Sequence, residues 1–107
     1  MGDYTTYLNY TVPRDNLVES VTVRQTADLG AYPSGWDYAL HLGTLDGTTL
    51  VRYDNAHETT KGHELHTPSQ DFEIAFPGMW ALLVRFYSET TAYWGAIGQT
   101  PPDRRPF

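Results

Sequence analysis

Reactive side chains are concentrated in two neighbouring segments, residues 51–57 and 61–66. The first reads VRYDNAH and the second reads KGHELH, so together they contain three of the four histidines. An imidazole titrates near neutral pH and can act as a general base or a general acid, while a guanidinium pairs with phosphate oxygens. These residue types therefore favour acid–base chemistry at a phosphate group.

The same residues have a purely structural interpretation. Arg52 and Asp54 are typical of the polar side of a strand. Asn55 and His57 follow that strand, where an Asp-Asn pair commonly forms a turn whose side chains bond to nearby backbone amides. Under this interpretation the segment shapes the chain and performs no chemistry.

A metal centre is a second alternative. Three imidazoles and a carboxylate could bind Zn²⁺, which would lower the pKa of a bound water and so supply a nucleophile. The candidate ligands are His57, His63 and His66, with Asp54, Glu58 or Glu64 completing the set. Their spacing fits no standard zinc finger.

The strings LVRYDNAH, KGHELH and FPGM, in this order, resemble the TumE-like toxins of toxin–antitoxin modules. The resemblance covers about residues 36–94. It implies a cytotoxic activity that acts on RNA, and an antitoxin partner with a DNA-binding helix-turn-helix. Carried over by position, the motif residues are Arg52, Tyr53, Asp54, Asn55, His57, His63 and His66.

Together these observations lead to the hypothesis of a metal-independent endoribonuclease that needs no cofactor. Its catalytic residues would be His57, His63 and His66 as acids and bases, Arg52 as the phosphate ligand and Asp54 as an orienting group. Binding contacts would come from Lys61, Asn55, Tyr53 and His41. A non-catalytic module that only binds the DNA-binding partner remains an alternative, and a homodimer remains open.

A β-hairpin over residues 36–55 should position the first reactive segment. The Asp-Gly pair at residues 46–47 is typical of a two-residue type I′ turn, which fixes the pairing of the two strands. The expected pairs are Leu40–Tyr53 and Leu42–Val51 on an apolar face, and His41–Arg52 and Ala39–Asp54 on the other. Tyr53 is therefore also a candidate core residue.

The remaining pattern predicts an α+β fold. Alternating apolar residues indicate strands over residues 4–12, 17–26 and 71–76, and residues 56–70 lack a period and should form a polar loop. Apolar residues recur every third or fourth position over residues 79–97, which predicts a helix. We expect an antiparallel sheet of four to five strands with this long C-terminal helix packed on one face. The domain would span residues 1–98, followed by a flexible proline-rich tail over residues 99–107.

Composition limits the possible classes. The 107 residues are 40% hydrophobic, which suffices for a single core. The absence of cysteine excludes disulfides and thiol nucleophiles and favours a cytoplasmic protein, and no apolar run is long enough to suggest a membrane partner. Thirteen acidic residues outnumber seven basic ones, of which six are Arg, a usage similar to that of halophilic archaea.

Overall fold

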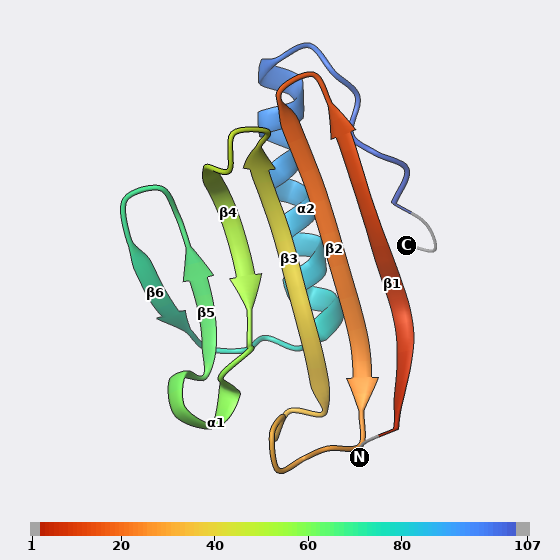
Figure 1. Cartoon of the computed structure of the whole chain (residues 1–107), viewed down its shortest axis with the longest axis vertical. Coiled ribbons are helices and arrows are strands. Elements are labelled where there is room, and N and C mark those ends of the chain that lie inside the picture. The colour runs from red at the N-terminus through yellow and green to blue at the C-terminus, as the bar shows by residue number, and fades with distance from the viewer. Residues whose placement is uncertain (1–2, 105–107) are drawn as a thin grey trace.

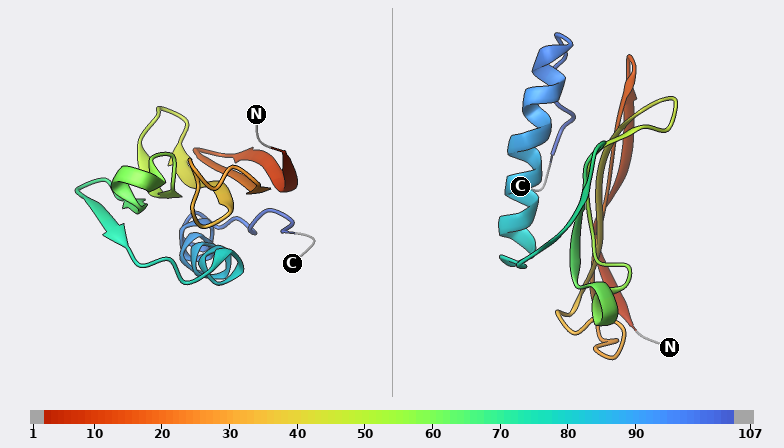
Figure 2. Two further views of the ribbon diagram at one scale, coloured as in Figure 1. Left: turned by 90° about the horizontal axis from the view of Figure 1, so that it is seen from below. Right: turned by 90° about the vertical axis from the view of Figure 1, so that its left-hand side faces the viewer.

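The computed structural model describes residues 3–104 as a six-stranded antiparallel sheet with one long helix behind it (Figure 1). Each strand pairs with the next along the chain. The elements are β1 (Tyr4–Arg14), β2 (Leu17–Thr26), β3 (Trp36–Thr44), β4 (Thr49–Asp54), α1 (Glu58–Lys61), β5 (His63–His66), β6 (Asp71–Ile74) and α2 (Met79–Ala96). In Figure 2, α2 lies along one face of the sheet, and no described element covers the other face.

The α+β class and the C-terminal helix are confirmed, but the sheet has six strands where four to five were predicted. The difference lies in residues 56–70, which contain α1 and β5 and are not a loop throughout. In β5, Leu65 lies between Tyr53 of β4 and Phe72 of β6. The two neighbouring strands supply the pairing partners of this four-residue strand. It can therefore form although its own sequence shows no clear alternation.

The hairpin pairs predicted for β3 and β4 are confirmed. The turn that joins them is different, because a type I′ turn needs positive φ at both central residues. Gly47 has a φ of +94°, whereas Asp46 is not among the described residues with positive φ. The Gly47 amide donates to the Thr44 carbonyl, and the pairing shifts by one residue between Leu42 and Gly43. The extra residue is absorbed in this bulge, so the pairing farther along the strands is unchanged.

The core lies between α2 and the sheet. The sheet contributes fully buried side chains that include Val21, Leu40 and Tyr53. The helix buries Met79, Leu82, Leu83, Phe86, Tyr87, Thr90 and Trp94. Tyr93 and Ile97, which the sequence pattern placed on the same apolar stripe, are 38% and 42% exposed because the stripe facing the sheet is narrower than predicted.

Residues 99–104 return beside the first hairpin instead of extending away from it (Figure 1). The Gln99 side chain donates to Asp15 at 2.6 Å, and Arg14 donates to the Thr100 carbonyl at 2.7 Å. Pro102 is buried. Residues 105–107 of the predicted flexible tail lie outside the described residues.

Candidate functional site

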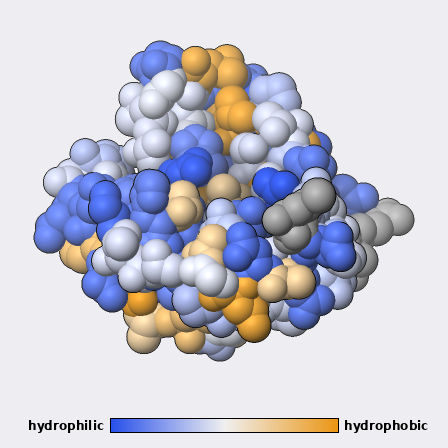
Figure 3. Space-filling view, turned by 60° about the horizontal axis from the view of Figure 1, so that its bottom comes forward, coloured by the Kyte–Doolittle hydropathy of each residue, from blue (hydrophilic) through white to orange (hydrophobic). Residues whose placement is uncertain are grey.

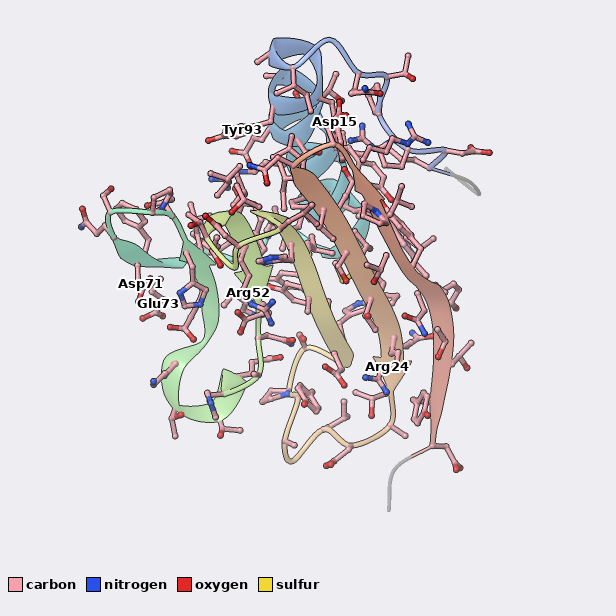
Figure 4. The ribbon with its side chains drawn as sticks, turned by 45° about the horizontal axis from the view of Figure 1, so that its top comes forward. Asp15, Arg24, Arg52, Asp71, Glu73 and Tyr93 are labelled. Carbon is pink, nitrogen blue, oxygen red and sulfur yellow. The ribbon has the colours of Figure 1, made fainter. Side chains whose placement is uncertain are left out.

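A row of polar residues crosses the uncovered face of the sheet. Backbone pairing aligns one residue from each strand, namely Thr11, Ser20, His41, Arg52, His66 and Asp71. Directly opposite residues on adjacent strands have Cβ atoms about 5 Å apart, so these side chains are neighbours. We call this set the polar row. In Figure 4, Arg52 on β4 lies between Arg24 of β2 and the pair Asp71 and Glu73 of β6.

Asp54 joins two members of the polar row. Its Oδ2 accepts a hydrogen bond from Arg52 Nε at 3.1 Å and lies 3.2 Å from His66 Nε2. The Asp54 side chain is only 8% exposed, so these contacts are shielded from water. The second ring nitrogen of His66 lies 2.8 Å from Asp71 Oδ1. A protonated His66 ring can therefore donate to a carboxylate on each side.

Asp71 is a site residue that the sequence did not reveal. Its strand was predicted, but nothing in the sequence identifies the strand that pairs with it. The pairing of His66 with Asp71 depends on β5, which forms inside the expected loop. Alternation within β6 alone could have placed Asp71 on the same polar face as Glu73.

His41 flanks Arg52 on the side opposite His66. Burial lowers the pKa of His41, and the neighbouring Arg52 guanidinium lowers it further. Gly43 makes room for the ring, because a Cβ at this position would lie 2.6 Å from His41 Nε2. His41 is therefore neutral at neutral pH, which is the form that can accept a proton.

His63 lies on the opposite face of the sheet from His66. Residues separated by three positions in a strand point to opposite sides, which a loop interpretation could not reveal. The His63 ring stacks on Phe76 with centroids 4.2 Å apart, and its Nδ1 lies 2.7 Å from the Tyr38 hydroxyl. Burial lowers the pKa of His63, although the nearby Glu58 carboxylate acts in the opposite direction.

His57 and Lys61 are exposed at the two ends of α1. The His57 carbonyl accepts a hydrogen bond from the Lys61 amide at 2.7 Å, which closes the single turn of this helix. Within residues 3–104, no hydrogen bond or ion pair links either side chain to the polar row. The three histidines that the sequence hypothesis made acids and bases, His57, His63 and His66, therefore do not share one site: one ring is exposed and the other two lie on opposite faces.

Asn55 and Tyr53, both predicted to bind substrate, are enclosed by the fold. Asn55 is fully buried; its side chain donates to Glu58 at 2.7 Å and accepts from the Tyr38 amide at 3.1 Å. This is close to the turn role that the sequence offered as an alternative. Tyr53 faces α2, as its pairing with a core strand residue predicted, and its hydroxyl donates to Glu89 at 2.7 Å.

One described group of side chains could hold a metal ion: Asp54, Glu64 and His66. One candidate ligand atom from each lies within 4.8 Å of the others. Glu64 enters this group because β5 pairs it with Asp54. His57 and His63, which the metal alternative also invoked, do not belong to the group.

The fold and the site define a class of protein: an antiparallel sheet with a helix on one face and a histidine- and arginine-containing polar row on the other. A comparison with known protein families matches residues 1–93 to the family described as Toxin TumE. The chain belongs to this family, so it is the toxin component of a toxin–antitoxin system and its partner is an antitoxin. The comparisons with curated proteins and with solved structures found no match. None of the described helices combines the length and hydropathy required to span a membrane.

Acidification should destabilise the protein. Both His63 and His41 have pKa values below the ordinary 6.5, so the unfolded chain binds protons at these rings more readily than the folded chain. Their contribution to stability is therefore present above about pH 6.5 and is lost as the pH falls. We expect the urea midpoint to be lower at about pH 5.5 than at about pH 7.5. His63→Gln should reduce the change of the urea midpoint with pH, whereas His57→Gln, at an exposed position, should leave that change as in the wild type. If His63→Gln also leaves it as in the wild type, the lowered pKa of His63 is contradicted.

Proposed function

We propose that this toxin cleaves RNA by metal-independent acid–base catalysis on the uncovered face of its sheet. The observation that supports the proposal is the alignment of His41, Arg52 and His66 on three adjacent strands. One imidazole on each side of a guanidinium supplies a base, an acid and a cation, which are the groups that cleavage by the 2′-hydroxyl requires. Membership of a toxin family is consistent with an attack on a cellular polymer.

The spacing of the polar row suits a phosphodiester. Adjacent strands are about 4.8 Å apart, so the backbones of His41 and His66 are separated by roughly 10 Å with Arg52 between them. Asp54 binds Arg52 Nε, which directs the two terminal nitrogens as a fork toward a phosphate. A phosphate on Arg52 would then have an imidazole on each side, as an in-line displacement requires.

Each histidine has a distinct role in this proposal. Neutral His41 accepts the proton of the 2′-hydroxyl, whose oxygen attacks phosphorus. The departing 5′-oxygen replaces the exposed Asp71 carboxylate at His66 Nδ1 and takes the Nδ1 proton, while Asp54 continues to hold Nε2. Arg52 neutralises the charge that develops on the phosphorane. The products are a 2′,3′-cyclic phosphate and a free 5′-hydroxyl. His41 thus takes the role that the sequence hypothesis gave to His57 and His63.

The test uses the purified toxin with a defined RNA in the presence and absence of EDTA. We expect cleavage that persists in EDTA and leaves 2′,3′-cyclic phosphate ends, as shown by the end group of each fragment. A toxin that arrests growth but leaves RNA intact would overturn the proposal and favour the non-catalytic alternative. We also propose that the antitoxin carries a DNA-binding helix-turn-helix. The toxin should then co-purify with the product of the adjacent gene, and that product should bind DNA.

A metal-dependent hydrolase is the second candidate, and the observation in its favour is the cluster of Asp54, Glu64 and His66. The same face also carries Asp71 and Glu73, so its carboxylates outnumber its cations and repel phosphate. A divalent cation would remove this repulsion and could activate a water. This candidate predicts that EDTA abolishes cleavage and that Glu64→Gln weakens metal binding measured by calorimetry.

A further inference from the structure

A buried carboxylate lies on the helix side of the sheet, away from the polar row. Glu19 of β2 is fully buried although its strand neighbours on the same face are apolar, Leu17 and Val21. A charged group in such a position is strongly destabilising unless it is paired and hydrogen-bonded. The partners of Glu19 therefore explain why it is tolerated.

Three side chains from different parts of the chain meet Glu19. The Tyr10 hydroxyl donates to Oε2 at 2.5 Å, and the Trp94 indole donates to Oε1 at 3.0 Å. The guanidinium of Arg104 donates to Oε1 at 2.9 Å and forms the ion pair. Arg104 thus supplies the positive charge, and it does so from a segment outside the regular sheet and helix.

The surroundings of Arg104 match the two terminal nitrogens and the flat face of its guanidinium. One terminal nitrogen also donates to Thr90 Oγ1 at 2.9 Å, and the other donates to Thr91 Oγ1 at 2.7 Å. The head group lies 4.4 Å from the centroid of the Tyr87 ring, in cation–π geometry. A lysine ammonium could not make this planar set of contacts. The Arg104 side chain is 14% exposed, so the contacts are largely shielded from water.

The groups that surround Arg104 belong to the folded body of the protein. We call the side chains that contact Arg104 or its partner Glu19 the arginine cage. They come from β1, β2 and α2, namely Tyr10, Glu19, Tyr87, Thr90, Thr91 and Trp94. The segment that carries Arg104 has no regular secondary structure and passes beside β1 in Figure 1. The family match ends at residue 93, so Arg104 lies beyond it. In Figure 3 the apolar residues of the face in view gather mainly near the top and along the lower edge, with hydrophilic residues between them.

We propose that this arginine cage is a binding site for an arginine side chain and that Arg104, by occupying it, fastens residues 99–104 to the folded body. The cage recognises the guanidinium by its charge, its planar fork and its cation–π face. Withdrawal of Arg104 leaves Glu19 buried without its cation, which weakens the packing of α2 on the sheet. The proposal is independent of the activity at the polar row.

The test is chemical rescue in the full-length chain. Arg104→Ala should lower the midpoint of thermal unfolding by about 10 °C and shift the NMR signal of the Trp94 indole N–H, which reports directly on Glu19. Millimolar ethylguanidinium should restore both values, whereas ethylammonium, which has the same charge, should not. Arg85→Ala, which removes an exposed arginine of α2, is the matched control and should show neither the shift nor the rescue.

Two further variants test whether the site needs the Glu19 carboxylate and the planar guanidinium. In Glu19→Gln/Arg104→Ala, ethylguanidinium should have no effect because the carboxylate is gone. If Arg104→Ala does not fold, Arg104→Lys should fold with a shifted indole signal, because the charge remains and the fork is lost. An unchanged indole signal in the Arg104 variant that folds, equal rescue of Arg104→Ala by ethylammonium, or no rescue of Arg104→Ala by ethylguanidinium would overturn the arginine site.

Discussion

Replacing Arg52 or His66 with alanine should slow RNA cleavage by about 100-fold or more while the protein remains folded. Arg52 is the phosphate ligand and His66 the general acid of the proposed mechanism, and both side chains lie on the uncovered face, away from the core. Single-turnover rates with a defined RNA measure the effect, and circular dichroism verifies the fold. His57→Ala removes an exposed imidazole from the same region and should retain the rate within about twofold.

The pH dependence of the rate distinguishes a catalytic His41 from a structural one. Arg52 helps to lower the pKa of His41, so Arg52→Ala should raise this pKa and move the acidic limb of the rate profile to higher pH. His41→Ala should remove that limb, because no base remains to be protonated. If the wild type, Arg52→Ala and His41→Ala keep the same acidic limb, His41 is not the base. If His57→Ala lowers the cleavage rate as much as Arg52→Ala or His66→Ala does, the polar row is not the active site.

The sequence predicted the parts of the fold that depend on local pattern. The pairs Leu40–Tyr53 and His41–Arg52 followed from alternation along two strands joined by a short turn, and they were correct although the turn type was not. Alternation survives a change in the turn because the bulge next to Gly43 compensates for the additional residue.

The sequence could not predict contacts that depend on tertiary pairing. His63 and His66 were treated as one group because they are close in sequence, but β5 directs them to opposite faces. His66 instead meets Asp71 through a strand pairing that no local pattern encodes. Glu19 and Arg104 are separated by most of the chain, and an acidic residue within an alternating strand gives no sign of a buried ion pair.

Asn55→Ala should lower the free energy of unfolding by about 3 kcal/mol, a large loss for the truncation of one uncharged polar side chain. The Asn55 amide donates to the Trp36 carbonyl at 2.6 Å and to Glu58 at 2.7 Å, and its carbonyl oxygen accepts from the Tyr38 amide. Alanine removes the partner of the Trp36 carbonyl and of the Tyr38 amide, whereas Glu58 keeps its two hydrogen bonds from Ser34. Urea unfolding at pH 7 measures the loss, and Asn9→Ala, at an exposed position, should stay within about 0.5 kcal/mol of the wild type.

Asn55→Asp separates the hydrogen bonds from the shape of the side chain. Aspartate has the same outline and can still accept from the Tyr38 amide, but it cannot donate and places a second carboxylate against Glu58. Repulsion between the two carboxylates should make this variant less stable than Asn55→Ala at pH 7, and its deficit relative to the wild type should shrink near pH 5, where the pair can take up a proton. A loss below about 1 kcal/mol in both variants would show that Asn55 does not hold β3, β4 and α1 together.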